Sequence, residues 1–215
     1  MTTVKDAVFD VLRRHGLTTL FCNPGSTEVA LLTGLPDDLR FVLALHEGSV
    51  VGMATGWAIG RDAPALAVLH TTAGLGNAVG AIATARENRA PLVVLVGQQD
   101  RRHLALEPFL TGRLAGLAGD YPVRVDQPVR AQDVPGAVAR AVHEARTHRG
   151  GPRWSWCRWT TGTRPSKGRS WPRRPGSCGP RRWWTPSWAR WWSCWPGPRG
   201  RRSWRARGCA TGGTR

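Results

Sequence analysis

The sequence predicts an α/β fold for residues 1–152, with a parallel sheet covered by helices on both faces. Short apolar runs alternate along this region with segments whose apolar residues recur at helical spacing. The runs are apolar throughout, which is typical of strands buried on both sides of a parallel sheet. The region is also long enough to bury one core of ordinary domain size.

The first half of this region is predicted to contain two strands and three helices. Val4–Arg14 carries apolar residues at helical spacing, and Gly16 suits the C-terminal cap. Leu17–Cys22 is an apolar run that enters the turn Asn23-Pro24-Gly25. Ser26 can cap a short helix that ends at Leu32. Phe41–Leu45 is the second predicted strand, and Glu47–Ile59 is the helix after it.

The second half continues the alternation. Its predicted elements are strand Ala65–His70, helix Asn77–Glu87, strand Leu92–Val96, strand Tyr121–Val125 and helix Val134–Ala145. The helix Asn77–Glu87 has small residues on one face, and Leu92–Val96 is wholly apolar. Functional sites in parallel sheets lie at the carboxyl ends of the strands. The segments Asn23–Ser26, His46–Glu47 and His70–Asn77 therefore mark the predicted site.

Residues 153–215 have a different composition. All 14 acidic residues and 15 of the 31 Lys and Arg precede residue 153, so nearly all of the net charge of +17 belongs to this basic tail. The tail contains no Leu, Ile, Val, Phe or Met, but it holds 11 of the 12 Trp. Such a segment cannot offset its ordering entropy, and we expect disorder. An Arg- and Trp-rich tail that binds nucleic acid is an alternative interpretation.

The tail is predicted to be an out-of-frame translation of a GC-rich gene. Trp has the single codon TGG, and a shift that makes its T a middle base gives a codon for Leu, Met or Val. One base added before the codon for Arg153 lets Arg153–Pro165 be read as ALVVVPMDDWDA with suitable synonymous codons. That sequence is typical of a buried strand and an acidic turn. Such a shift would arise either from a sequencing error or in a true pseudogene.

Single residues also allow plain structural interpretations. Glu47 is a suitable first-turn residue for a helix dipole, Ser26 a suitable helix cap and His70 a suitable strand-end histidine. In HTTAGLGNAVG, from His70 to Gly80, the third glycine comes one place too late for a dinucleotide fingerprint. No signal peptide or membrane-length apolar run is found, so we expect a cytoplasmic protein.

Four stretches taken together carry a family resemblance: FCNPGSTEVALL, LALHEGSVVGMATGWA, LHTTAGLGNAVGAI and PLVVLVGQQDR. In order and spacing they resemble the N-terminal, pyrimidine-binding domain of thiamine diphosphate-dependent decarboxylases, closest to the benzoylformate decarboxylase group. The resemblance covers nearly all of residues 1–152. His70 and the turn AGLGN differ from the Ser-Gly-Pro-Gly turn of acetolactate synthase-like relatives.

The resemblance implies roles for particular residues. Glu47 matches the glutamate that hydrogen-bonds the aminopyrimidine ring of thiamine diphosphate and exchanges a proton with it. Ser26 matches a serine that contacts the substrate carboxylate, and His70 matches a histidine that moves protons to and from the reacting group. Four further residues are placed beside the cofactor: Pro24, Gly25, Gly74 and Asn77.

The resemblance also implies parts outside the pyrimidine-binding domain. The diphosphate and Mg²⁺ are held by a G-D-G…N motif on a later domain, which is not found in this sequence, so we expect this chain by itself to be inactive. The site forms between two subunits, so the intact enzyme is expected to be a homodimer or homotetramer. An aromatic 2-oxo acid is the expected substrate. His46 and Thr27 stand where glutamine and asparagine are expected, which keeps other 2-oxo acids open.

Overall fold

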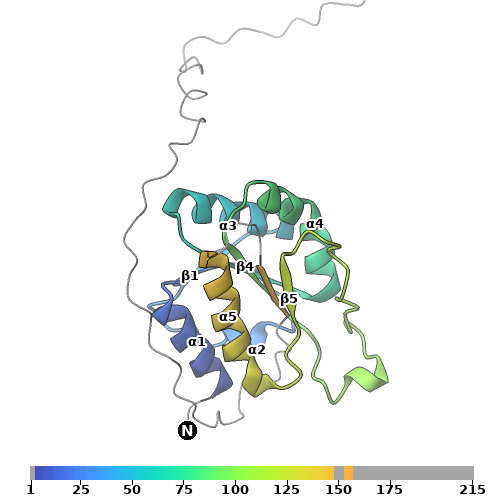
Figure 1. Cartoon of the computed structure of the whole chain (residues 1–215). Helices are drawn as coiled ribbons and strands as arrows, with labels where there is room; N and C mark the ends of the chain where they lie inside the picture. The colour runs from blue at the N-terminus through green and yellow to red at the C-terminus, as the bar shows by residue number, and fades with distance from the viewer. Residues whose placement is uncertain (1–2, 148–152, 157–215) are drawn as a thin grey trace, which may run out of the picture. The chain divides into compact units, whose positions relative to one another are not determined.

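The computed structural model describes residues 3–147 and the backbone of residues 153–156. These residues form a six-stranded sheet in the order β2-β1-β3-β4-β6-β5, and every neighbouring pair is parallel. The strands are β1 Thr19–Asn23, β2 Arg40–Leu43, β3 Ala65–Leu69, β4 Leu92–Val96, β5 Arg124–Asp126 and β6 Arg153–Trp156. Figure 1 shows helices on either side of the sheet, which confirms the predicted fold class.

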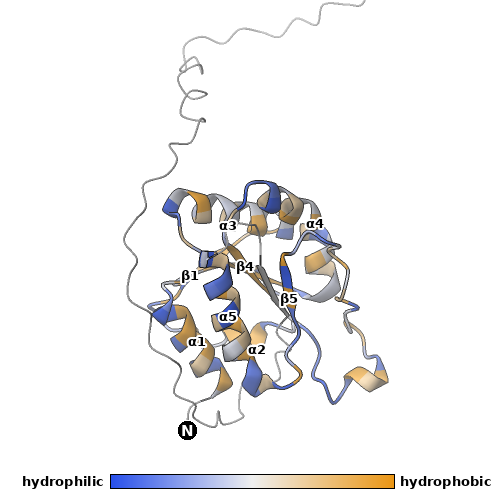
Figure 2. Ribbon diagram, in the orientation of Figure 1, coloured by the Kyte–Doolittle hydropathy of each residue, from blue (hydrophilic) through white to orange (hydrophobic). Residues whose placement is uncertain are grey.

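Two helical layers cover the sheet. The helices are α1 Val4–Arg14, α2 Val29–Leu32, α3 Glu47–Arg61, α4 Thr71–Glu87 and α5 Val134–Thr147, with 3₁₀ turns at Leu104–Leu106 and Ala131–Asp133. One buried cluster joins α1 and α5 to alternate residues of β4, including Val93 and Leu95. A second cluster joins α3 and α4 to Val94 and Val96. In Figure 2 β4 is apolar, whereas the helices are partly polar.

The amino-terminal helix shows how local sequence sets an element boundary. Thr3 accepts from the backbone N–H of Asp6 at 3.1 Å, and Asp6 accepts from the backbone N–H of Thr3 at 2.9 Å. This reciprocal capping box satisfies donors that the first helical turn leaves unpaired. Val8 and Leu12, one turn apart, are buried against the sheet.

Three predicted elements differ in their bounds from the structure in ways that bear on the site and on the sheet. Ser26 does not cap the helix before Leu32, because α2 begins at Val29 and Ser26 lies on the preceding turn. The helix predicted from Asn77 begins at Thr71, since Gly74 lets its first turn pack against Leu69 and Glu47. The strand predicted at Tyr121–Val125 is displaced to Arg124–Asp126, where the backbone pairs with β6.

Strand β6 lies where the frame-shifted sequence predicts the last strand. Its backbone pairs with both β4 and β5, so it is an interior strand. Positions 153 and 155 are in register with the buried residues Val93 and Leu95, and positions 154 and 156 with Val94 and Val96. Interior parallel strands are normally apolar, as β3 and β4 are, whereas β6 reads Arg-Trp-Ser-Trp.

The predictions for the rest of the basic tail lie outside the described residues, because only the backbone of residues 153–156 is described there. Among the residues that are described, no helix is both long and apolar enough to cross a membrane.

Candidate active site

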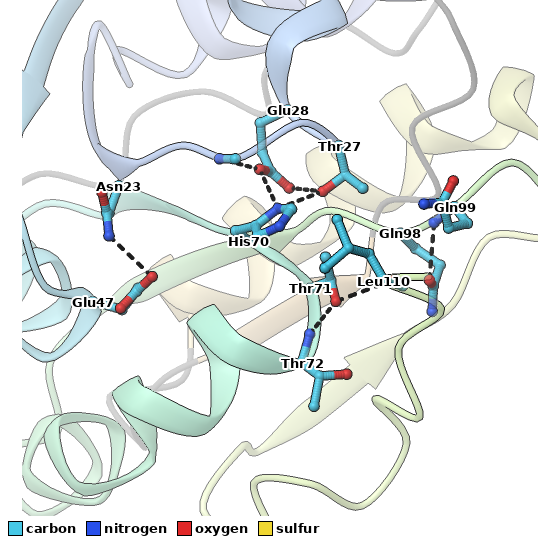
Figure 3. A network of polar contacts seen from close by, with 11 residues as sticks. Asn23, Thr27, Glu28, Glu47, His70, Thr71, Thr72, Gln98, Gln99 and Leu110 are labelled. Atoms are coloured by element: carbon cyan, nitrogen blue, oxygen red, sulfur yellow. Dashed lines mark hydrogen bonds and ion pairs between the residues drawn. The ribbon is translucent and has the colours of Figure 1, made fainter. Parts of the chain in front are cut away.

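The carboxyl ends of β1 and β3 and the first turns of α3 and α4 meet at one edge of the sheet. Asn23 ends β1, Glu47 begins α3, and His70 lies between β3 and α4. Figure 3 shows these three residues on neighbouring segments. The structure thus brings residues of the three predicted segments together at this edge.

Glu47 is a buried carboxylate between two side-chain amides. The residue is 6% exposed. Oε1 accepts from Asn23 Nδ2 at 3.1 Å, and Oε2 accepts from Asn77 Nδ2 at 3.0 Å. A Cβ at Gly74 would lie 3.5 Å from Glu47 Cγ, so the glycine keeps room beside this carboxylate. The two hydrogen bonds fix the orientation of the Glu47 carboxylate. Because both donors are neutral amides, neither bond is an ion pair.

A second polar cluster joins His70 to the turn after β1. Glu28 Oε2 lies 2.9 Å from His70 Nδ1 and accepts from the backbone N–H of Gly25 at 2.8 Å. Thr27 Oγ1 lies 2.9 Å from the same His70 nitrogen and donates to Glu28 Oε1. Figure 3 shows dashed contacts from the ring of His70 to both Glu28 and Thr27, which also contact each other.

Burial and hydrogen bonding act in opposite directions on the pKa of Glu28, which is 2% exposed. Burial raises the pKa of the Glu28 carboxyl, because a carboxylate loses solvation there. The hydrogen bonds from Thr27 and Gly25 and the neighbouring His70 act in the opposite direction and stabilise the ionised form. The pKa remains above its ordinary value on balance.

Two glycines leave no room for a side chain beside this cluster. A Cβ at Gly25 would overlap the ring of His70, and a Cβ at Gly97, just after β4, would overlap Glu28 Oε1 and Thr27 Oγ1. The backbone therefore approaches both members of the His70–Glu28 pair closely, as glycine permits.

A loop after β4 closes around the start of α4. Gln98 Nε2 donates to the carbonyl of Gly112 at 2.6 Å, and Gln98 Oε1 accepts from the Gly112 N–H at 3.0 Å. Thr71, which has a φ of 29°, donates from Oγ1 to the carbonyl of Leu110 at 3.4 Å. A β-branched residue at positive φ is strained, and the strain lies directly beside His70.

The structure brings most of the predicted site residues together and leaves two of them exposed. Asn77 is hydrogen-bonded to Glu47, Gly74 lies beside Glu47, and Gly25 contacts the His70–Glu28 pair. Ser26 and Pro24 are exposed on the turn, and Thr27 rather than Ser26 reaches His70. The assigned roles of all these residues remain predictions.

The sequence interpretation missed Glu28 and Gln98, and it named Asn23 and Thr27 without predicting their contacts with Glu47 and His70. A local signal existed only for Glu28. It stands three residues after Gly25, the spacing at which a glutamate side chain turns back to a backbone N–H. Among the described residues, no group of three or more His, Cys, Asp or Glu could hold a metal ion.

Cys22 is buried at the end of β1, close to both carboxylates. Burial raises the pKa of its thiol to about 12, and the charges of Glu28 and Glu47 add to this effect. We expect alkylation of Cys22 by iodoacetamide at pH 8 to be at least ~100-fold slower in the folded chain than in urea, because the thiolate is the nucleophile. Mass spectrometry of the tryptic peptide of residues 15–40 isolates Cys22 from the other four cysteines. Equal rates in the two conditions would contradict this placement.

The fold and the site define a class of protein: an α/β domain that presents a buried carboxylate and a histidine at the cofactor-binding edge of a parallel sheet. Comparison with known families agrees with this class, since residues 2–117 match the family described as "Thiamine pyrophosphate enzyme, N-terminal TPP binding domain". The chain belongs to this family of thiamine diphosphate-dependent enzymes. A carboxylate held only by neutral amides suits that cofactor, whose aminopyrimidine ring offers nitrogen partners.

Individual relatives are decarboxylases. The chain is 45% identical over 146 residues to benzoylformate decarboxylase of Pseudomonas aeruginosa, which covers 67% of this chain and 28% of the relative. The thiamine diphosphate-dependent 4-hydroxybenzoylformate decarboxylase of Rhodococcus jostii RHA1 is 40% identical with a TM-score of 0.69, over 72% of this chain and 29% of that one. Benzoylformate decarboxylase of Polynucleobacter necessarius is 38% identical with a TM-score of 0.78, over 82% and 33%. The chain therefore spans about a third or less of each relative.

Proposed function

We propose that residues 1–152 form the pyrimidine-binding part of a thiamine diphosphate-dependent decarboxylase of 2-oxo acids. The observation that carries the proposal is Glu47, a buried carboxylate held from both sides by Asn23 and Asn77. A glutamate that only stabilised the start of a helix would do so equally well if it were exposed to solvent. Burial between two neutral amides instead prepares a carboxyl group for proton exchange with a bound ring.

Three residues of this chain would act on cofactor and substrate. When bound, thiamine diphosphate would supply a nucleophilic carbon for the 2-oxo acid carbonyl and a sink for the electron pair that departing CO₂ leaves behind. Glu47 would bind the aminopyrimidine ring and exchange a proton at a carboxyl oxygen. His70 would hold and deliver a proton near the reacting group, and Ser26, exposed on its turn, would contact the substrate carboxylate.

The proposed substrate is an aromatic 2-oxo acid. Two of the similar proteins carry benzoylformate in their names and a third carries 4-hydroxybenzoylformate. His46 and Thr27 differ from the residues expected at these positions by resemblance. Thr27 contacts His70, while His46 Nδ1 accepts from the N–H of Gly48 and caps α3. A different 2-oxo acid is therefore the competing substrate to include in any assay.

The proposed active form is a homodimer or homotetramer that binds Mg²⁺ with the diphosphate on a domain outside the pyrimidine-binding one. Features of α3 support close approach of another chain. Gly52, Gly56 and Gly60 recur every four residues, and a Cβ at any of them would meet nothing within 4 Å. Met53 and Ile59 on the same helix are 38% and 46% exposed. An apolar, glycine-lined helix surface is suited to subunit contact.

We also propose that the codons after Pro152 are read out of frame. The position of β6 supports this proposal, because the shifted sequence Ala-Leu-Val-Val would place apolar residues in an interior strand. Resequencing the gene across the codons for Pro152–Trp154 tests it. An added base in every read supports a sequencing error, whereas the printed sequence in every read supports a pseudogene and leaves the basic tail as a real product.

Decarboxylation by the frame-restored enzyme tests the proposed function. This enzyme is the full-length product of the gene with one base added before the codon for Arg153. We expect it to release CO₂ from benzoylformate only with thiamine diphosphate and Mg²⁺, and more efficiently than from pyruvate. The 215-residue chain, treated identically, is expected to be inactive. Cofactor-independent release, or no release from any aromatic 2-oxo acid, would contradict the proposal.

A further inference from the structure

We propose that Glu28 is a positioning residue for His70: its carboxylate holds the imidazole in the Nδ1–H tautomer and leaves Nε2 as the nitrogen that exchanges protons. The consequence for catalysis rests on the proposed function of this site. The tautomer itself is a property of the chain and can be measured without cofactor or substrate.

The proton count around Glu28 supports this assignment. The proton count takes Glu28 as ionised, the form that its hydrogen bonds from Thr27 and Gly25 and the neighbouring His70 stabilise against the effect of burial. An ionised carboxylate only accepts hydrogen bonds. Oε1 accepts the Thr27 hydroxyl proton, and Oε2 accepts the Gly25 N–H at 2.8 Å. The third neighbour, His70 Nδ1 at 2.9 Å from Oε2, satisfies the carboxylate only as a donor. Because the Thr27 hydroxyl proton is used by Glu28, Thr27 Oγ1 can only accept from the same nitrogen at 2.9 Å.

The surrounding backbone keeps the two side chains together. Gly25 lies against the face of the His70 ring, and Gly97 lies against Glu28 Oε1. The side chain of Glu28 is 2% exposed, whereas that of His70 is 16% exposed. The accessible part of the pair therefore belongs to the histidine. This arrangement follows the general rule that the partner of one ring nitrogen decides which nitrogen is free for chemistry.

The direct test is nitrogen NMR of the ¹⁵N-histidine-labelled 215-residue chain at about pH 8.5, above the ordinary pKa of histidine. Loss of one signal set in a His70→Gln variant assigns His70 among the six histidines. We expect a protonated Nδ1 and an unprotonated Nε2. An unprotonated Nδ1 in the unmodified chain would overturn the proposal, whatever the variants do.

Three variants separate the partners of Nδ1. Glu28→Leu removes the acceptor, and we expect both tautomers to be populated. Glu28→Gln keeps an amide oxygen for Gly25 and His70 and turns its NH₂ toward Thr27 Oγ1, so the Nδ1–H form should persist. Thr27→Val removes only the hydroxyl, and the Nδ1–H form should persist there as well. A tautomer that changes in Thr27→Val, or that stays single in a folded Glu28→Leu chain, contradicts the role of Glu28.

Activity of the frame-restored enzyme gives an independent readout. We expect Glu28→Leu to lower kcat about 10- to 100-fold, the usual effect of removing the partner that orients a functional side chain, with a smaller change in KM. Glu28→Gln should recover part of the loss. If the frame-restored enzyme is active and Glu28→Leu leaves its kcat unchanged, the positioning role is refuted while the proposed function stands. An inactive parent would refute the proposed function, while the NMR result would still decide the tautomer.

Discussion

Glu47→Gln in the frame-restored enzyme is expected to lower decarboxylation by about 10²–10⁴-fold, the usual effect of losing a positioned proton-transfer group. Glutamine keeps the size of the side chain, but its amide cannot exchange a proton as a carboxyl group does. It also places an NH₂ group against the amide of Asn23 or Asn77, one of which must then present its oxygen instead. The fold is expected to survive, since this adjustment needs only rotation of one amide.

Two measurements distinguish this role from a structural one. The exchange rate of the thiazolium C2 hydrogen of bound thiamine diphosphate should fall together with activity, while the unfolding midpoint stays nearly constant. Glu87→Gln, at the exposed end of α4, is the matched control and should change neither rate. If Glu47 only stabilised a helix terminus, its loss would cost at most about 1 kcal/mol of stability and leave activity intact. Equal exchange rates would mean that the wrong glutamate was assigned.

Replacing Arg153-Trp154-Ser155-Trp156 by Ala-Leu-Val-Val in the 215-residue chain is expected to raise the free energy of unfolding by about 2–4 kcal/mol. The backbone of this segment lies between β4 and β5, in register with Val93, Leu95 and their neighbours. An interior strand position favours aliphatic residues and penalises a guanidinium group and a hydroxyl. Urea unfolding followed by circular dichroism measures the change.

A polar strand provides the control for this exchange. Four threonines at positions 153–156 keep a high strand propensity without the aliphatic surface, so they should recover only a small part of the gain. An unchanged urea midpoint for Ala-Leu-Val-Val would show that the segment contributes no interior strand in solution. It would also remove the structural support for the frame-shift proposal.

The sequence was most informative where a strand is buried on both sides. Leu92–Val96 was predicted with the bounds that β4 has, because a wholly aliphatic run lies between Pro91 and Gly97. Helix α3 also begins at Glu47 as predicted. The strand predicted at Phe41–Leu45 is less accurate, since β2 ends at Leu43. This strand lies at the edge of the sheet, where it has a partner on one side only, and it is largely exposed.

The polar details of the site could not be predicted from local pattern. Glu28 and His70 are 42 residues apart in the chain, and only the parallel pairing of β1 with β3 brings the turn and the strand end together. Asn23 and Glu47 are 24 residues apart and meet because β1 also pairs in parallel with β2, the strand that precedes α3. Helix α4 begins at Thr71, before the predicted start at Asn77. Gly74, which by sequence pattern usually marks a turn, lies within the first helical turn, where a small residue fits against Glu47.

The order of the strands also constrains how the protein is made. During synthesis β4 and β5 leave the ribosome before β6, which must later enter between them. Until then the Leu-Val-Val-Leu-Val edge of β4 has an unpaired row of backbone groups, the kind of edge on which chains aggregate. At roughly 5–20 residues per second, the chain from Val96 to Trp156 takes several seconds to emerge. We therefore expect the edge of β4 to be a segment of the nascent chain that is open to aggregation during that interval.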